Sequence, residues 1–212
     1  MIKVENVQTW GIEHAVRAVR NPLSSWSKSD SGYIASGEHY ENVDYVIGPN
    51  DLALMKKLAK AGVEHRTYAR LIQVSMDVTA PLLWWKEADR YCVGKSQIST
   101  STMHTLTAKR FEMTDFSTDE MSDIGLQTLK DIIDALNDMR EMYLETKQKA
   151  IWRDIVCILP ESFNQKRTVL MSYEVCLKMI CEREGHKLSE WRTFCDALKR
   201  LPYIRELLEG LE

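Results

Sequence analysis

The amino-acid sequence predicts an α+β fold, because segments with the period of a strand and segments with the period of a helix occur in one chain. Between residues 68 and 78 most even positions are apolar and positions 73, 75 and 77 are polar, which is the two-residue period of a half-buried strand. Between residues 124 and 143 apolar residues recur every three or four positions, as in a long amphipathic helix. A chain of 212 residues suits one sizeable core, so we expect one domain over residues 1–212.

The N-terminal part of the chain is expected to contain a strand, two helices and a long loop. Residues 2–7 suit a first strand, and residues 12–19 have helical spacing. Residues 23–42 show no period, and two interpretations stay open: a loop that folds over a ligand, or a mobile surface loop. Asn50 is the expected N-cap of a helix that Gly62 ends.

A polar segment follows the central strand and its helix. Arg70 is the one charged residue on the apolar face of that strand. Pro81 suits the first turn of a helix, which we expect to run to Tyr91 and to stop at Gly94. Residues 95–102 are rich in Ser and Thr, and they fit both a loop that holds an anion or a nucleotide and a solvated connector.

The C-terminal half is expected to be mainly helical. The long amphipathic helix should start at Ser117 or Thr118, and its many carboxylates indicate a solvated face rather than paired-acid chemistry. Helical spacing recurs in four later segments: 151–159, 169–181, 188–198 and 202–208.

Composition argues against several classes of function. A net charge of −3 and a pI near 6.0 argue against non-specific nucleic-acid binding, which needs a basic face. No apolar run reaches membrane-spanning length and no signal-peptide layout opens the chain, so we expect a cytoplasmic protein without a membrane partner. The five cysteines include no Cys-x-x-Cys pair and the five histidines are scattered, so neither a disulfide framework nor a metal site is expected.

Several of these segments resemble one enzyme family. His65-Arg66-Thr67, the central strand, Ala80-Pro81 and the helix that reaches Arg90 resemble the flavin-dependent thymidylate synthases. The signature of that family, RHRxxSxNExSxR, places its first Arg on Arg90 and its late Ser on Thr100. The other defined positions of the signature carry different residues in this chain, namely Tyr91, Cys92, Lys95, Gln97, Ile98 and Thr102.

The C-terminal half extends the resemblance. The last Arg of the family's Leu-x-Leu-Arg sequence falls on Arg183, and its His and Trp fall on His186 and Trp191 after one inserted residue. The family's Asn and first Arg fall on Ser172 and Glu174, so the charge at residue 174 is reversed. A carboxylate there repels a pyrophosphate, so we expect FAD to bind more weakly than in the family.

The resemblance implies an antiparallel sheet packed against several helices, a homotetramer with sites between subunits, and methylation of dUMP at C5 with methylenetetrahydrofolate, FAD and NADPH. In this comparison Arg183 and Thr100 are catalytic, and substrate binding falls to Arg90, Thr100 and Arg183. The residues assigned to FAD are His65, Thr67, Arg90 and His186. Sequence spacing alone also fits a surface role for His65 and an ordinary C-terminal-turn arginine at residue 183.

Two functions therefore stay open at this point. The first is a divergent thymidylate synthase, and the second is a catalytically inactive relative that binds a nucleotide or a protein partner. Because the other arginines of the signature are replaced, we expect dUMP methylation to be absent or very slow. Three tryptophans, Trp84, Trp85 and Trp191, exceed what one small core should absorb, and we expect them at the interface of an oligomer.

Overall fold

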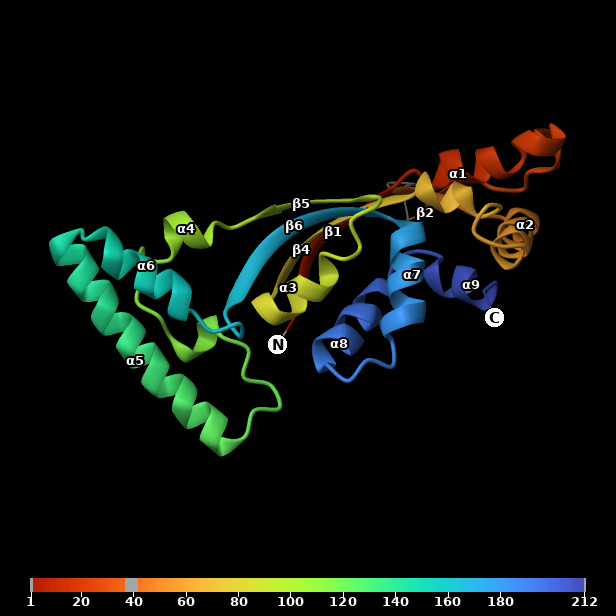
Figure 1. Ribbon diagram of the computed structural model, residues 1–212. Helices are drawn as coiled ribbons and strands as arrows, with labels where there is room; N and C mark the ends of the chain where they lie inside the picture. Colours follow the sequence, from red (N-terminus) through yellow and green to blue (C-terminus); the bar gives the residue numbers. More distant parts are fainter. Residues whose placement is uncertain (1, 37–41, 212) are drawn as a thin grey trace.

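The computed structural model describes residues 2–36 and 42–211, and its centre is a four-stranded antiparallel sheet (Figure 1). The strand order is β1-β4-β6-β5, so β4 and β6 lie in the middle and β1 and β5 form the edges. The strands are β1 (Lys3–Trp10), β4 (Gln73–Pro81), β5 (Lys95–Ser99) and β6 (Asn164–Ser172). Every neighbouring pair is antiparallel, so the predicted α+β fold with an antiparallel sheet is confirmed.

Helices cover one face of this sheet. Side chains along β4 alternate between partly exposed and buried up to Ala80, which confirms the two-residue period of this segment. The buried side packs against three helices that lie on the same side of the sheet in Figure 1: α3 (Leu82–Ala88), α7 (Tyr173–Arg183) and α8 (Ser189–Leu198).

Aromatic rings fill the space between the sheet and these helices. Trp84, Trp85, Trp191 and Phe194 each expose 1% of their surface or less, and the rings of Trp84 and Trp191 are 4.8 Å apart between centroids. The expectation that these tryptophans lie at an interface is wrong, because the core of the chain absorbs all three.

Short elements gather at one end of the sheet. They are α1 (Ile12–Val19), η1 (Asn21–Leu23), η2 (Trp26–Lys28), the hairpin of β2 (Gly32–Ser36) and β3 (Asn42–Val46), α2 (Pro49–Lys60), η3 (Thr67–Arg70) and α9 (Ile204–Glu209). The fully buried carboxylate of Asp51 joins several of them. It accepts hydrogen bonds from Arg20 Nε at 2.7 Å, Ser29 Oγ at 2.5 Å and Ser31 Oγ at 2.6 Å.

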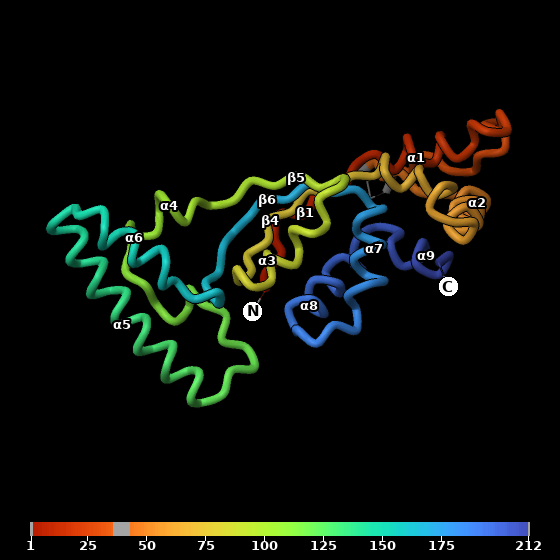
Figure 2. Tube along the Cα trace, viewed as in Figure 1, coloured from red at the N-terminus to blue at the C-terminus, as the bar shows by residue number. Residues whose placement is uncertain are grey.

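Residues 100–163 form a helical insertion between the neighbouring strands β5 and β6. It contains α4 (Thr102–Thr105), η4 (Met113–Asp115), α5 (Asp123–Thr146) and α6 (Lys149–Ile158). Figure 2 shows the chain leaving β5 and returning to β6 through this insertion. Its buried apolar residues form a cluster of their own: Leu106, Phe111, Phe116, Leu129, Ile133, Leu136 and Ile155. The single domain over residues 1–212 stays a prediction.

The structure corrects several expected elements. The predicted loop at residues 95–102 is largely the edge strand β5. The stripe at 169–181 is not one helix, because β6 ends at Ser172 and α7 begins at the next residue. The predicted loop at 23–42 contains η1, η2 and β2, and its residues 37–41 lie outside the described part of the chain.

Helix and strand starts also differ from the expectation. The central strand begins at residue 73, because residues 67–70 form η3. Asn50 lies inside α2, and the carboxylate of Asp30 accepts a hydrogen bond from its backbone N–H at 2.8 Å. Pro81 is the extended last residue of β4 and the N-cap of α3. Helix α5 starts after its N-cap Ser122, and not at residue 117 or 118.

Candidate functional site

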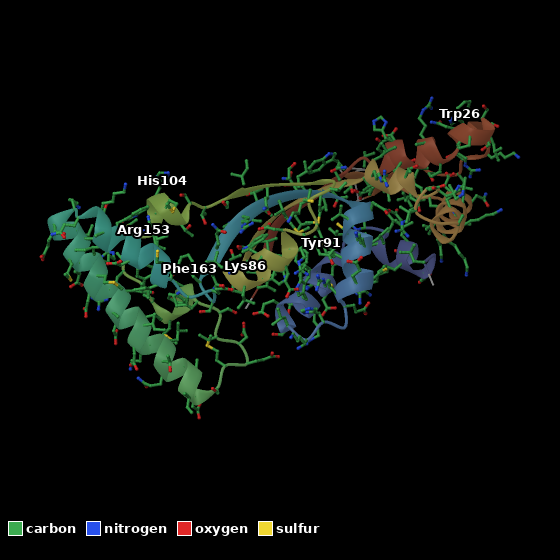
Figure 3. All side chains as sticks on the ribbon, viewed as in Figure 1. Trp26, Lys86, Tyr91, His104, Arg153 and Phe163 are labelled. Atoms are coloured by element: carbon green, nitrogen blue, oxygen red, sulfur yellow. The ribbon has the colours of Figure 1, made fainter. Side chains whose placement is uncertain are left out.

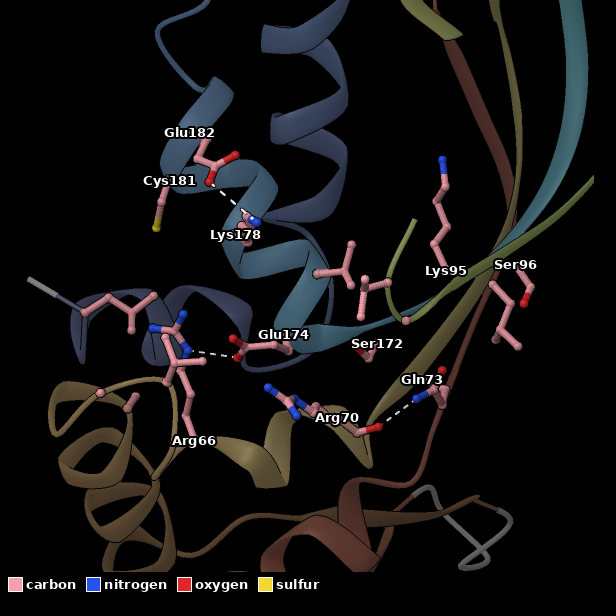
Figure 4. A pocket seen from close by; sticks show the side chains of 18 of the residues that line it. Arg66, Arg70, Gln73, Lys95, Ser96, Ser172, Glu174, Lys178, Cys181 and Glu182 are labelled. Atoms are coloured by element: carbon pink, nitrogen blue, oxygen red, sulfur yellow. Dashed lines mark hydrogen bonds and ion pairs between the residues drawn. The ribbon is translucent and has the colours of Figure 1, made fainter. Parts of the chain in front are cut away.

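A cleft of about 1010 Å³ opens where β5 and β6 meet η3 and the first turns of α7. We call it the α7 cleft. Its polar lining comes from residues far apart in the sequence, chiefly Lys60, Arg66, Arg70, Gln73, Ser96, Ser172, Glu174, Lys178 and Glu182. Figure 4 shows Arg66, Arg70, Glu174 and Glu182 among the side chains that reach this space from different elements.

Backbone geometry brings α7 to the wall of this cleft. The N–H of Ser172 donates to the carbonyl of Gly94 at 3.3 Å, and the N–H of Tyr173 donates to Ile72 at 2.9 Å. Gly94 has a φ of +75°, which other residues rarely adopt. A Cβ at this position would also lie 3.3 Å from a methyl group of Val175. The turn before β5 is therefore built for glycine and fixes the first turn of α7 against the sheet.

Two of the basic residues in the cleft already have acidic partners. Arg66 Nε donates to Glu174 Oε2 at 2.8 Å, and both side chains are about 85% buried. Lys178 Nζ lies 3.9 Å from Glu182 Oε1, one turn along α7. Both pairs are drawn as dashed lines in Figure 4. Lys60 and Arg70 form no ion pair with any described residue.

Lys95 lines the cleft but points elsewhere. Its side chain is 4% exposed, and Nζ donates to the carbonyl of Ala88 at 2.7 Å and lies 3.5 Å from Asp89. Burial lowers the pKa of Lys95, and the carboxylate of Asp89 opposes that shift. In Figure 4 the side chain points away from Arg66 and Arg70, so we assign it to the core rather than to a ligand.

Thr100 lies in a different hollow, of about 350 Å³, at the junction of the sheet and the helical insertion. We call it the Thr100 hollow. Its wall carries hydroxyls from residues 100–102 and 105, together with Lys109, Phe163 and Asn164. Thr100 Oγ1 donates to the carbonyl of Lys166 at 3.2 Å. Figure 3 shows Phe163 at the junction between the insertion and α3.

Arg183 and His186 belong to a polar cluster around Glu87 on α3. Arg183 Nη1 lies 3.0 Å from Glu87 Oε2, and its Nε donates to the hydroxyl of Tyr91 at 2.9 Å. His186 Nε2 lies 3.5 Å from the same carboxylate oxygen. The Tyr91 hydroxyl donates to Glu182 at 2.7 Å, and burial together with this carboxylate raises the pKa of Tyr91.

The remaining predicted residues lie apart from these places. His65 and Thr67 are exposed and line a shallow hollow of about 370 Å³ beside α1 and α2. Arg90 is exposed, and its side chain forms no hydrogen bond or ion pair with a described residue. Within one chain, Arg183 and His186 therefore lie together at Glu87, and His65 and Thr67 lie together in the hollow beside α1 and α2. Thr100 and Arg90 lie apart from both pairs.

The residues assigned to FAD do not fit one flavin site within a single chain. His65 and Thr67 lie in one hollow, Arg90 is on the surface, and Nδ1 of His186 accepts a hydrogen bond from the N–H of Leu188. The residue where the family has an arginine is Glu174, and it occupies Arg66.

Sequence reasoning missed the α7 cleft as a unit. Arg70 was visible as the exception on an apolar strand face, and Arg66 stands inside the His-Arg-Thr sequence that carries the resemblance. The sequence did not show that these arginines and Glu174 line one cleft, because Glu174 is 108 positions from Arg66. Among residues 2–36 and 42–211, no group of three His, Cys, Asp or Glu side chains is arranged to hold a metal ion. None of the described helices is long and apolar enough to cross a membrane.

This chain is similar to known proteins in structure but not detectably in sequence. No protein-family model and no curated sequence matches the chain. The flavin-dependent thymidylate synthase ThyX of Helicobacter pylori, complexed with FAD and dUMP, superimposes with a TM-score of 0.69 at 17% identity, over 99% of this chain and 100% of that chain. A second structure of the same enzyme gives the same TM-score and identity over 100% of both chains.

A related fold occurs in a second enzyme. The UMP/dUMP methylase PolB of Streptomyces cacaoi, bound with 5-Br dUMP, gives a TM-score of 0.63 at 14% identity over 99% of this chain and 94% of that chain. At these identities the likeness establishes architecture. The chain has the fold of the flavin-dependent thymidylate synthase ThyX over its whole length.

Proposed function

We propose that this protein binds a pyrimidine nucleoside monophosphate of the dUMP or UMP class and methylates it slowly or not at all. The observation that carries the proposal is the whole-chain likeness to two enzymes whose structures hold dUMP or 5-Br dUMP. The Thr100 hollow supports it, since hydroxyl groups like those of residues 100–102 and 105 bind ribose and phosphate. Lys109, in the same wall, is ion-paired with Asp115.

The nucleotide site in this proposal lies between copies of the chain. Within one chain Thr100, Arg90 and Arg183 are in separate places, so a shared site requires a neighbouring copy to supply part of it. A homotetramer, as the resemblance implies, provides such neighbours. Thr100 then contacts the nucleotide from one copy, and Arg90 and Arg183 supply positive charge from another.

Slow methylation follows from the shortage of positively charged side chains that are free to bind a phosphate. Arg183 is held by Glu87, and Arg66 is held by Glu174, so two cations are already neutralised before a ligand arrives. Each missing charge-assisted contact to a phosphate costs about 1.5–3 kcal/mol, which is roughly ten- to a hundredfold in affinity. FAD, and with it NADPH and methylenetetrahydrofolate as co-substrates, is accordingly bound weakly or not used.

The second candidate is a binding protein without methylase activity. The charge reversal at Glu174 favours it, because a carboxylate in the cleft opposes the negatively charged cofactor that the reaction of the family needs. The two candidates share nucleotide binding and differ in turnover alone.

Calorimetric titration with dUMP and UMP tests the shared part. We expect binding of the intact protein, about threefold or more weaker in Thr100→Ala and about tenfold weaker in Arg183→Ala. Lys130→Ala, which removes an exposed charge from α5, is the control and should bind as the unmodified protein does. No heat with either nucleotide at about millimolar concentration sinks the proposal.

Growth of a thymidine-requiring strain that expresses the protein separates the two candidates. We expect no growth or slow growth without thymidine. Full complementation that disappears in Arg183→Ala establishes the synthase and contradicts the expected slow chemistry. Nucleotide binding without complementation favours the binding protein.

A further inference from the structure

The Thr100 hollow contains a buried polar atom that has no partner. Oδ1 of Asn164, the first residue of β6, is shielded from water, and no described residue donates a hydrogen bond to it. A buried oxygen without a donor costs free energy, so folded proteins rarely leave one in that state. Asn164 also lines the hollow, and the last torsion of an asparagine side chain turns easily. A ligand in the hollow can therefore supply the missing donor after a small rotation of the amide.

The wall of the hollow offers no free cation to a phosphate. Lys109 is the one basic residue in the described wall, and it is ion-paired with Asp115. The Asp115 carboxylate belongs to the same wall and also accepts a hydrogen bond from the N–H of Glu112 at 3.0 Å. A phosphate in the hollow would meet this carboxylate without an unpaired cation to offset it. The hollow therefore suits an uncharged part of a ligand.

Apolar side chains give the hollow a surface for a flat ring. They are Leu106, Ala108, Phe111 and Phe163. The rings of Phe111 and Phe163 lie edge to face, with 6.3 Å between their centroids. Aromatic rings favour contact with further rings in such arrangements. A volume of about 350 Å³ is within the range of pockets that hold small ligands, so a single six-membered ring has room here.

We propose that the Thr100 hollow holds the base of the nucleotide, a uracil ring, and that Asn164 fixes this orientation by accepting a hydrogen bond from N3–H of the ring. Nδ2 of the same amide donates to one of the two ring carbonyls beside N3. The phosphate then points out of the hollow, toward the arginines that a neighbouring copy supplies. This inference rests on the nucleotide binding proposed above. It adds which part of the ligand enters the hollow and which residue recognises that part.

Two changes to the ligand separate the base from the phosphate. Methylation of N3 removes the donor, so we expect N3-methyl UMP to bind about five- to tenfold more weakly than UMP in calorimetric titration of the intact protein. Removal of the phosphate gives uridine, whose weaker binding should fall by a similar factor on N3 methylation.

The outcomes of these titrations distinguish the two proposals. If UMP and N3-methyl UMP bind equally, the inference about Asn164 and the base is overturned, whereas nucleotide binding stays intact. If UMP does not bind at about millimolar concentration, the proposed function and this inference fail together.

The variant Asn164→Leu removes the amide and keeps the side chain near its original size. UMP should bind this variant about five- to tenfold more weakly than the unmodified protein. UMP and N3-methyl UMP should bind the variant about equally, because the hydrogen bond that methylation removes is already absent. Asn50→Leu, at an exposed position of α2, is the matched control and should keep the preference for UMP. A preference for UMP that is as large in Asn164→Leu as in the control overturns the role of Asn164.

Stability separates a residue that recognises the ligand from one that supports the fold. Because Oδ1 of Asn164 has no partner in the free protein, the change to Leu should not lower the free energy of unfolding in urea. A variant that loses stability but keeps the preference for UMP shows a structural residue and overturns the proposal. The comparison of UMP with N3-methyl UMP needs no variant, so it decides the question even if Asn164→Leu does not fold.

Discussion

Glu87 on α3 and Arg183 on α7 form an ion pair, with 3.0 Å between Oε2 and Nη1. The same oxygen accepts a hydrogen bond from Trp191 Nε1 at 3.2 Å, and the guanidinium lies 5.0 Å from the centroid of the Trp191 ring. The cation that the resemblance assigns to the substrate is therefore already stacked and paired inside the chain. Any ligand that uses Arg183 competes with Glu87.

Replacement of Glu87 by Gln tests this competition. The loss of the pair should lower the free energy of unfolding by about 1–2 kcal/mol, because both side chains are mostly but not fully buried. The same change frees Arg183 and should raise dUMP affinity several-fold. Urea unfolding and calorimetric titration measure the two effects, with Glu145→Gln on the exposed face of α5 as control. Equal dUMP affinity in both variants argues that Arg183 does not contact the ligand.

The carboxylate of Asp51 should make the free energy of unfolding depend on pH in the acidic range. Burial alone raises the pKa of Asp51, but hydrogen bonds from Ser29, Ser31 and Arg20 outweigh it and hold the pKa below its usual value. A lowered pKa in the folded state means stability that is complete above about pH 4 and is lost as the pH falls through the folded value. Urea unfolding from neutral pH down to about pH 3 should show this loss.

The matched variant is Asp51→Asn. It leaves Arg20, which is 7% exposed, without its counter-charge and should destabilise the protein by about 3–5 kcal/mol at neutral pH. Its stability should also vary less between neutral and acidic pH than that of the unmodified protein. Parallel pH curves for the two proteins contradict the assignment.

Thiol labelling should separate the cysteines into two groups. Cys92, Cys157 and Cys181 are exposed, whereas Cys176 and Cys195 are buried. Burial raises the pKa of Cys195 to about 11 and also raises that of Cys181. In the folded protein near neutral pH we expect Cys92 and Cys157 to react first, Cys181 more slowly, and the buried pair only after unfolding. Mass spectrometry of the labelled peptides checks the order.

Asn137 holds the helical insertion together. Its amide oxygen accepts from the N–H of Phe111 at 2.8 Å, and its amide nitrogen donates to the Phe111 carbonyl at 3.0 Å. Asn137→Ala leaves both buried backbone groups unpaired and should cost about 2–4 kcal/mol. Hydrogen exchange should rise first in residues 100–163. Gln127→Ala, on the exposed side of α5, should change stability by less than about 0.5 kcal/mol.

The oligomeric state tests the shared-site proposal. The three tryptophans are buried in the core and give no support for an interface. The expectation of a homotetramer therefore depends on the sequence resemblance to the family and on the separation of Thr100, Arg90 and Arg183 within one chain. Light scattering at micromolar concentration should report a mass well above that of one chain. A stable monomer that still binds dUMP shows that one chain suffices.

The sequence predicted the class of fold well and two strands poorly. β5 has at most one partly buried side chain, so it lacks the apolar alternation by which strands are recognised, and edge strands are commonly polar. In β6, Val169 and Leu170 happen to continue the helical spacing of α7 backwards. The pattern therefore ran through the strand–helix boundary at Ser172, where no Pro or Gly marks a change.

The candidate sites, like the fold, were predicted from the sequence only in part. Arg66 and Arg70 lie in segments that stood out in the sequence. Arg66 is paired with Glu174, 108 positions away, whereas Arg70 forms no ion pair with a described residue. Periodicity describes neighbours along the chain. It contains no information on which carboxylate a given arginine meets, and that information decides which cations remain for a ligand.

The helical insertion also has a consequence for the order of folding. All buried residues of its apolar cluster, from Leu106 to Ile155, lie inside the insertion, whereas β5 and β6 are separated by the whole insertion. The contacts within the insertion need no residue outside it, and a folded insertion holds its two ends near each other. At those ends Thr100 N–H donates to the Lys166 carbonyl, and the Gln165 amide donates to the Thr100 carbonyl. We therefore expect the insertion to fold first and to lower the entropy cost of pairing β5 with β6.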